Sequence, residues 1–399
     1  MSELLSFEAA LERLLGAVSP LSELELLPTA QCLGRVLAAD VVSALDVPPL
    51  DNAAMDGYAL RVADLAAGQP LPVSQRVPAG SVPQALAAGT CARIFTGAPV
   101  PPGADVVVMQ EVCEASDAGV RVTIDRPIGQ HIRRRGEDVR QGSVVLAAGH
   151  RLDPAALGLA ATVGAASLSV TRRLRVALFS TGDELVMPGE PLKPGAIYNS
   201  NRFTLRGLLE GLGCEVVDLG IVPDQLEATR AALREAAGRA DVIVTSGGVS
   251  VGEEDHLRPA VQAEGQLDLW RIAIKPGKPL AFGRVGQAKF VGLPGNPVSS
   301  LVTFVMLVRP VLLRMMGATQ IAPTRYLLRA DFAWPRPDAR REFLRVRLNA
   351  SGGLELFSNQ GSGVLTSAVW GDGLVDNAPG QAVAPGDVVG FIPFRELMA

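Results

Sequence analysis

The chain has 399 residues, of which 48% are hydrophobic, and a formal net charge of −4. This composition is sufficient for several hydrophobic cores and excludes a disordered scaffold, and the length favours two to four domains. The slight acidic excess argues against a nucleic-acid-binding protein, whose surface would be basic.

Cysteine usage and the lengths of the apolar runs indicate the compartment. Four widely spaced cysteines form no CxxC pair, and the chain has three histidines. We therefore expect a reducing, cytoplasmic setting without a transition-metal site made of His and Cys. The first fifteen residues do not resemble a signal peptide. The longest apolar run, Val298 to Val308, is too short for a membrane span and predicts a buried core helix in a soluble protein.

The N-terminal part begins with an amphipathic helix. Apolar residues recur at spacings of three and four between Leu4 and Val18, and Ser6 is the expected N-cap. From residue 41 the chain contains many Pro and Gly residues and short β-branched runs, which indicate a small β-domain. Asp153 and Pro154 then predict the cap and first residue of a short helix ending near Gly164. The β-domain is therefore expected to be an insertion into an N-terminal helical domain.

Strand and helix patterns alternate in the second half. Apolar, strand-like runs cover residues 175–180, 215–222, 241–245 and 289–293. Asp224 is the expected start of one intervening helix, and Asn296 and Pro297 predict the cap and first residue of another. This alternation indicates a doubly wound α/β domain. Short alternating strands after Gly317 indicate a C-terminal β-barrel or sandwich.

These patterns divide the chain into four domains. The expected division is a discontinuous, elongated N-terminal domain (1–45 and 138–172), an inserted β-domain (46–137), an α/β domain (173–317) and a C-terminal β-domain (318–399).

Polar, glycine-rich loops follow the strand-like runs of the α/β domain, at the positions where open α/β sheets bind ligands. One loop contains Ser246, Gly247 and Gly248, whose backbone N–H groups can converge on an anion. A second holds Lys275 and Lys278 between prolines, in an arrangement suited to a dianion. Because the carboxyl ends of parallel strands meet at one edge, we expect these loops to line one crevice together with Glu184.

Seven motifs occur in order along the chain: DNAAMDGYA (51–59), FTGAPVPPGAD (95–105), IRRRGED (132–138), FSTGDEL (179–185), SGGVSVGEEDH (246–256), IKPGKP (274–279) and GLPGNP (292–297). With these motifs the whole chain resembles the molybdopterin molybdenumtransferase family, whose fold is shared by the C-terminal domain of gephyrin. The resemblance implies an α/β domain of molybdopterin-binding type and an elongated homodimer with active sites between the subunits. It also implies that molybdate is inserted into adenylylated molybdopterin with release of AMP, in the presence of Mg²⁺ or a similar divalent ion.

The resemblance also assigns the site residues. The catalytic residues would be Asp56, Asp138, Glu184 and Asp255, of which Asp56, Glu184 and Asp255 would hold the metal through hard carboxylate oxygens. The substrate-binding residues would be Thr96, Ser246, Gly247, Gly248, Ser250, Lys275, Lys278, Pro294, Pro297, Arg345 and Ser362. Expected partners are molybdopterin adenylyltransferase and apo-molybdoenzymes in transient contacts, but neither nucleic acid nor a membrane.

Simpler interpretations of these residues stay open. The glycine loop could form a plain tight turn, Glu184 and Asp255 could be carboxylates at helix starts, and the cleft lysines and Arg345 could face solvent. Two other functions are alternatives. A molybdopterin adenylyltransferase would resemble the α/β domain alone, and a gephyrin-like scaffold would need an exposed apolar groove.

Overall fold

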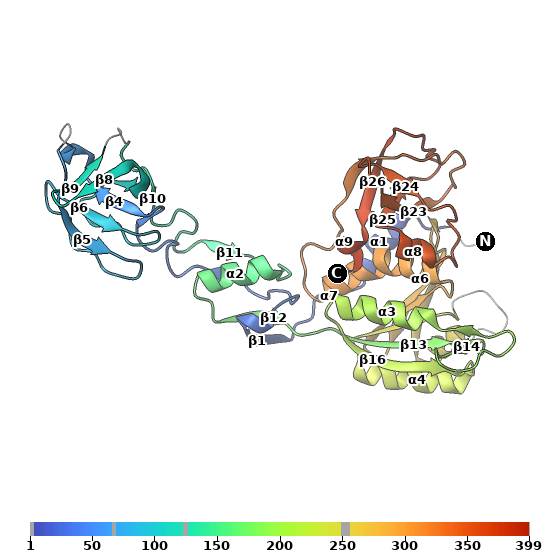
Figure 1. Ribbon diagram of the computed structural model, residues 1–399. Helices are drawn as coiled ribbons and strands as arrows, with labels where there is room; N and C mark the ends of the chain where they lie inside the picture. The colour runs from blue at the N-terminus through green and yellow to red at the C-terminus, as the bar shows by residue number, and fades with distance from the viewer. Residues whose placement is uncertain (1–3, 66–68, 123–126, 249–255, 399) are drawn as a thin grey trace.

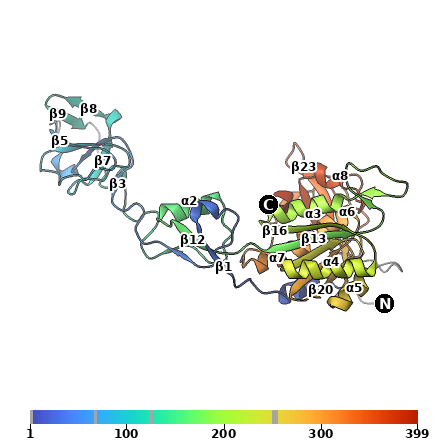
Figure 2. The same cartoon turned by 90° about the horizontal axis from the view of Figure 1, so that it is seen from below.

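The structure is a computed structural model that describes residues 4–65, 69–122, 127–248 and 256–398. Three bodies follow one another in an elongated arrangement (Figures 1 and 2). We call them the distal body (residues 48–138), the middle body (24–47 and 139–171) and the large body (4–18 and 174–398). The described ends of the chain both belong to the large body.

A six-stranded sheet with the order β16-β13-β17-β21-β20-β18 forms the centre of the large body. Its parallel strands are β16 (Glu215–Val222), β13 (Arg175–Thr181), β17 (Val242–Ser246) and β21 (Ala288–Leu293), which confirms the four predicted runs. The antiparallel strands β20 (Pro279–Val285) and β18 (Gly265–Arg271) extend the sheet. A short ribbon of β14 (Leu185–Val186) and β15 (Ile197–Tyr198) lies beyond β13.

Helices cover both faces of this sheet, so its inner strands are apolar on both sides. The helix α3 (Ser200–Gly211) shares one core with the helices near the C-terminal sheet, while α4 (Leu226–Arg239) and α5 (Leu257–Glu264) share the core on the opposite face. The prediction that Asp224 opens α4 was wrong. The N-cap is Gln225, whose carbonyl accepts a hydrogen bond from the N–H of Thr229 at 2.9 Å.

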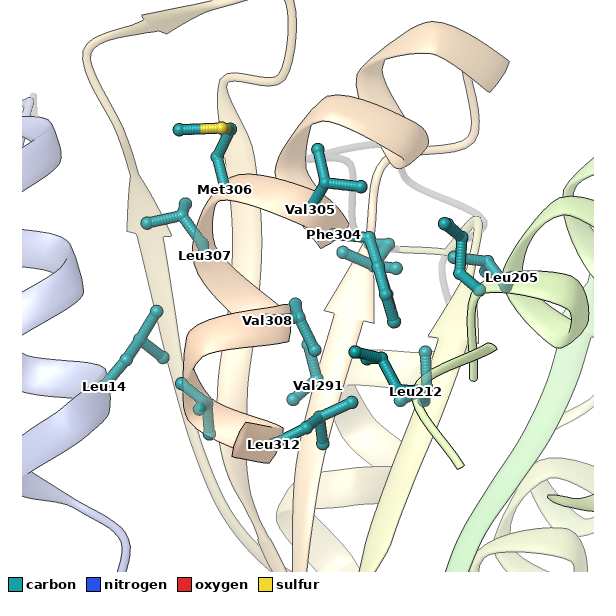
Figure 3. Packing of buried hydrophobic residues seen from close by; sticks show 14 of the residues in the cluster. Leu14, Leu205, Leu212, Val291, Phe304, Val305, Met306, Leu307, Val308 and Leu312 are labelled. Carbon is teal, nitrogen blue, oxygen red and sulfur yellow. The ribbon is translucent and has the colours of Figure 1, made fainter. Parts of the chain in front are cut away.

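One long apolar helix lies in the core of the large body. It comprises α6 (Pro297–Thr303), a π-turn (Phe304–Val308) and α7 (Arg309–Met315), and begins at Pro297 as predicted. The apolar run continues past Arg309 and Pro310. The wider π-turn precedes Pro310, which lacks a backbone donor and would crowd a regular preceding turn. Residues 297–315 are long and apolar enough for a membrane span, but 94% of the most apolar window is buried inside the protein. Figure 3 shows these side chains packed among Leu14, Leu205 and Leu212.

The first helix packs in the large body. Helix α1 (Phe7–Gly16) begins after Ser6, whose Oγ accepts a hydrogen bond from the N–H of Ala9 at 3.1 Å, as predicted. Its buried stripe includes Phe7 and Leu14 and contacts α7, and the Phe7 ring lies edge-on to Phe343 at 5.7 Å. Residues 7–16 therefore share their core mainly with the α/β and C-terminal sheets, and Val18 and Val36 of the N-terminal region join the same core.

The middle body has a core built from two separate stretches of chain. Its elements are β1 (Leu24–Pro28), β12 (Ser167–Thr171), β2 (Val41–Val42), β11 (Val144–Leu146) and α2 (Pro154–Thr162). Asp153 caps α2 as predicted, with its Oδ1 accepting from the N–H of Ala156 at 2.7 Å. Val47 and Val139 pair where the chain leaves for the distal body and returns, so the distal body is an insertion.

In the described residues the distal body is built of strands and two short 3-10 turns, Val62–Asp64 and Gln110–Val112. A four-stranded sheet in the order β5-β6-β4-β7 is flanked by two ribbons. The sheet contains β5 (Val73–Val77), β6 (Cys91–Ile94), β4 (Gly57–Leu60) and β7 (Val106–Met109). The ribbons are β3 (Asn52–Ala53) with β10 (Ile132–Arg133), and β8 (Cys113–Ser116) with β9 (Gly119–Val122).

The C-terminal sheet packs against α1 and the long helix. Its order is β19-β23-β25-β26-β22, with β24 on β23, and a bridge between Ala330 and Leu354 connects its two sides in a barrel-like closure. The elements are β19 (Ile274–Lys275), β22 (Tyr326–Arg329), β23 (Arg341–Leu348), β24 (Leu354–Leu356), β25 (Gly373–Asn377), β26 (Val388–Pro393), α8 (Thr366–Trp370) and α9 (Phe394–Met398). Strand β19 comes from the α/β region and connects the two sheets.

Candidate active cleft

A cleft of about 580 Å³ opens beyond the carboxyl ends of β17 and β21. It is lined by Glu184, Gly247, Gly248, Lys275, Pro276, Gly277, Lys278, Pro279, Pro294, Gly295, Asn296, Ser299, Arg340, Gln360, Gly361 and Ser362. A neighbouring compartment of about 350 Å³ shares Glu184 and Gly247 with it and reaches Ser246 and Pro297. The structure thus brings the three predicted loops together at one edge of the sheet, and residues from the C-terminal sheet close the far wall.

The glycines of the first loop are required by its geometry. Gly247 and Gly248 have φ angles of +88° and +64°, which side-chain-bearing residues rarely adopt. A Cβ on Gly248 would lie 3.0 Å from Thr181 Oγ1 and 3.1 Å from Leu257 Cβ. The GLPGNP loop lies in ordinary van der Waals contact with this loop, since a Cβ on Gly295 would lie 3.8 Å from the Cα of Gly247. Asn201 fixes this approach by donating from Nδ2 to the carbonyl of Gly295 at 2.8 Å.

The two predicted lysines differ in their surroundings. Lys275 Nζ lies 3.0 Å from Glu342 Oε1 and 3.5 Å from Asp338 Oδ2, so its charge is already paired. Among the residues that the structure describes, Lys278 makes no side-chain ion pair. The chain contains just four lysines, Lys193, Lys275, Lys278 and Lys289. Two of the four therefore line the cleft.

Arg345 lies beneath the cleft and does not line it. Its side chain is 1% exposed and donates to the carbonyls of Gly361 (3.2 Å) and Phe343 (3.1 Å) and to Ser367 Oγ (3.1 Å). Burial lowers the pKa of the guanidinium to about 10. The alternative that Arg345 faces solvent was therefore wrong. Arg345 supports the loop that carries Ser362, and it adds a buried positive charge behind that loop.

Ser362 lines the cleft, and its backbone also caps a helix. Its carbonyl accepts a hydrogen bond from the N–H of Val298 at 2.9 Å, in the first turn of α6. That N–H group is therefore taken by the protein and is not free to bind an anion.

The remaining predicted acidic residues are spread over the molecule. Glu184 is exposed at the cleft, whereas Asp56 and Thr96 lie together in the distal body. Asp56 Oδ1 accepts from the hydroxyl (2.7 Å) and the N–H (2.8 Å) of Thr96, and these bonds lower the pKa of Asp56. Asp138 is exposed where the distal and middle bodies join, and its N–H donates to the carbonyl of Val47 at 3.0 Å. Ser250 and Asp255 lie outside the described residues.

Family models match almost the whole chain in three consecutive parts. The "MoeA N-terminal region (domain I and II)" matches residues 5–164, the "Probable molybdopterin binding domain" residues 177–314 and the "MoeA C-terminal region (domain IV)" residues 328–394. A molybdopterin molybdenumtransferase of Haemophilus influenzae is 39% identical over 404 residues, with 99% of this chain and all of that protein covered.

The chain belongs to the molybdopterin molybdenumtransferase family. A family member from Synechococcus elongatus is also 39% identical, over 92% of this chain and 93% of its own length. The crystal structure of a molybdopterin biosynthesis MoeA protein from Pyrococcus horikoshii OT3 superposes with a TM-score of 0.84 at 28% identity, covering 98% of this chain and 100% of that one. These matches confirm the resemblance and the multidomain fold that the motifs indicated.

The resemblance to the family implies a divalent ion, which carboxylates at the cleft would have to bind. No group of three or more His, Cys, Asp or Glu side chains that could hold a metal occurs within the described part of the chain. Glu184 is the one carboxylate among the described residues that line the cleft and its neighbouring compartment. A single carboxylate at the cleft fits Mg²⁺, because this ion commonly binds one or two protein carboxylates and completes its coordination shell with phosphate oxygens and water.

The resemblance identified Ser362, but the sequence patterns did not identify the other residues that the C-terminal region adds to the cleft. Arg340 and Gln360 line it, and Gln360 is fixed by a reciprocal pair of hydrogen bonds with the backbone of Arg345 at 2.9 and 3.0 Å. Arg340 pairs with Asp338 at 2.8 Å, and this hydrogen-bonded pair holds the pKa of Asp338 well below its usual range. The sequence feature that could have indicated Arg340 is the charged stretch PDARRE, which leads into an alternating strand.

Proposed function

We propose that this chain inserts molybdate into adenylylated molybdopterin and releases AMP. The observation that supports the proposal is the cleft at the carboxyl ends of parallel strands. There the family's glycine-rich loops meet Lys278, which makes no ion pair with any described residue. Such a site suits two substrates, one that contains a phosphoanhydride and one that is a small oxyanion.

The described residues suggest a division of roles. The Gly247–Gly248 loop presents backbone to the phosphates, and Lys278 and Ser362 bind the molybdate oxygens on the opposite wall. Arg345 contributes its charge from beneath the loop of Gly361. Water attacks the phosphoanhydride and AMP leaves, while the two dithiolene sulfurs displace molybdate oxygens that leave as water after protonation. No protein nucleophile is required.

Magnesium would be held by Glu184 and by the substrate's phosphate oxygens. When bound, it would supply charge neutralisation at the phosphoanhydride. The family resemblance adds the carboxylate of Asp255, which lies outside the described residues, to this proposed set.

The distal residues suggest that the active site is shared between two copies. Asp56 and Thr96 lie at the opposite end of the molecule from the cleft of their own chain (Figure 1). We infer an elongated homodimer in which the distal body of one copy, with Asp56, Thr96 and Asp138, meets the cleft of the other. We also retain the cytoplasmic setting as a proposal, and the four-domain division except that helix α1 packs in the large body.

Complementation tests the shared site. Asp56→Ala and Lys278→Ala variants should each be inactive, because each lacks one half of every site. Co-expressed, they should regain about a quarter of the wild-type AMP release, since about half of the dimers are mixed and each has one intact site. Mixed protein that stays inactive, although mixed dimers form, would refute the shared site.

The reaction is tested with purified protein, adenylylated molybdopterin, molybdate and Mg²⁺. Molybdate-dependent AMP release together with reconstitution of an apo-molybdoenzyme is the expected result. Conversion of molybdopterin and ATP to the adenylylated form would instead favour an adenylyltransferase. No turnover of either kind would favour a gephyrin-like scaffold.

A further inference from the structure

The backbone places Lys275 opposite a residue of the C-terminal sheet. Strands β19 and β23 run parallel, and their register pairs Lys275 with Glu342. The N–H of Arg341 donates to the carbonyl of Ala273 at 2.9 Å and fixes this register. The lysine loop of the cleft is therefore attached to the C-terminal sheet by main-chain hydrogen bonds.

Glu342 is fully buried and is hydrogen-bonded through both carboxylate oxygens. Oε1 accepts from Lys275 Nζ at 3.0 Å. Oε2 accepts from Trp334 Nε1 at 2.7 Å, from the N–H of Asp338 at 3.1 Å and from Asn377 Nδ2 at 3.5 Å. Since a buried carboxylate is costly without a cationic partner, the cation and the carboxylate hold each other in place.

We propose that Glu342 is a positioning residue that holds the Lys275 ammonium in the cleft wall, so that the unpaired charge offered to the oxyanion comes from Lys278. The proposal rests on the proposed function. The Lys275 ammonium has three N–H donors. One donates to Glu342, and Asp338 lies 3.5 Å from Nζ as a second ion-pair partner, so the ammonium keeps a donor for a bound anion. The Trp334 ring, whose centroid lies 5.8 Å from Nζ, restricts the movement of the Lys275 ammonium on another side.

Glutamine at position 342 cannot reproduce this arrangement. Its amide has one acceptor oxygen, whereas donors approach both oxygens of Glu342. Because three donors approach Oε2, the amide oxygen should take that side and turn the NH₂ group toward the Lys275 ammonium. Two donors then face each other, and Lys275 loses its fixed place.

The test is a double-mutant cycle on molybdate-dependent AMP release. Glu342→Gln should lower kcat/KM for molybdate about tenfold, as expected for the loss of one charge-assisted hydrogen bond. In a Lys275→Gln background the same change should cost less than about twofold, because Glu342 acts through Lys275. A full tenfold effect in that background would show a purely structural role and overturn the proposal, as would an unchanged Glu342→Gln enzyme. Glu355→Gln, in an exposed ion pair with Arg347 on the same sheet, is the control and should behave as wild type.

A second measurement needs neither turnover nor a variant. With few lysines in the chain, acylation of each amine can be followed separately by mass spectrometry on the native protein. Lys275 should react about threefold more slowly than Lys278, because its ammonium is held by carboxylates. Equal rates would overturn the proposal even if the enzyme variants do not fold. An inactive wild type with slow Lys275 labelling would instead refute the proposed function and leave the positioning role standing.

Discussion

Gly277 stands between the two cleft lysines and sets how closely their loop approaches the helix behind it. Its φ is +113°, and a Cβ there would overlap Thr303 Oγ1 and lie 3.3 Å from the carbonyl oxygen of Ser299. Thr303 Oγ1 is buried and has no hydrogen-bond partner among the described residues, so this hydroxyl is a steric neighbour of the loop. A single hydrogen atom in place of a side chain thus fixes the positions of both lysines.

Gly277→Ala should lower the free energy of unfolding by about 1–3 kcal/mol, because it adds an overlap to an unfavourable φ. AMP release should also fall, since the loop must move away from α6. Adding Thr303→Ala removes the overlapping hydroxyl and should recover part of the loss, measured by thermal unfolding and by kcat/KM. Gly142→Ala has a similar φ, +84°, and open space, so it reports the backbone strain alone. Equal losses in Gly277→Ala and Gly142→Ala would contradict the steric explanation.

At the scale of elements, two helices have the same start in sequence and different caps in space. Both α2 and α6 begin at a proline after an Asx residue. Asp153 makes a capping bond to Ala156, whereas Asn296 makes no side-chain capping bond and lines the cleft. The first turn of α6 is instead capped by the carbonyl of Ser362. The start of a helix was predictable from local residues, but the group that caps it was not.

Asp153→Ala should therefore lower the free energy of unfolding by about 1 kcal/mol, the usual contribution of an N-cap side chain. Asn296→Ala should cost less stability, because no capping bond is lost, yet should reduce AMP release. Thermal melts and initial rates of the two variants would check this. The reverse order of stability would contradict the assignment of caps.

The local sequence pattern predicts the loops of the site but not the contacts between distant segments. The Gly247 loop and the lysine loop were predictable because each follows an apolar strand whose direction the α/β alternation determines. The contact between Lys275 and Glu342 was not, because it depends on the register of two strands far apart in sequence. Alternation along β23 indicated two faces but could not say that Arg345 would face the interior.

At the scale of the whole molecule, Arg172 is one of several residues that connect the middle and large bodies, together with Arg151 and Thr319. Arg172 donates two hydrogen bonds to Asp241 at the start of β17 (2.7 and 2.8 Å) and also pairs with Glu23, just before β1. Burial alone would raise the pKa of Asp241, but hydrogen bonds from Arg172 and from the N–H of Arg175 outweigh it and lower that pKa. The relative placement of two bodies thus depends on an ionised, half-buried carboxylate.

Asp241→Asn should loosen this connection. We expect a loss of about 1–3 kcal/mol in the free energy of unfolding at neutral pH, as for other charge-assisted hydrogen bonds, and a broader distribution of sizes in small-angle scattering. A depressed carboxyl pKa stabilises the fold above the unfolded value, about 4, and this stabilisation disappears as the pH falls through the folded value. Wild type and variant should therefore converge in stability toward low pH.

Glu215→Gln, in an exposed ion pair with Arg175, is the control and should change neither the free energy of unfolding nor the distribution of sizes. A constant stability gap down to low pH would contradict the role of the Asp241 charge.

Because Val47 pairs with Val139, the distal body could be removed from the chain or replaced as one unit. Its two connections are neighbouring backbone segments, bonded N–H to carbonyl at 2.7 and 3.2 Å, so a tight turn could close the chain in its place. A chain shortened in this way would keep the cleft with its glycine loops and both lysines, and it would lack Asp56 and Thr96. If the active site is shared as proposed, the cleft and the part contributed by the second copy are therefore separable at one point of the chain. An ancestor or an engineered descendant could gain or exchange that contribution through a single insertion.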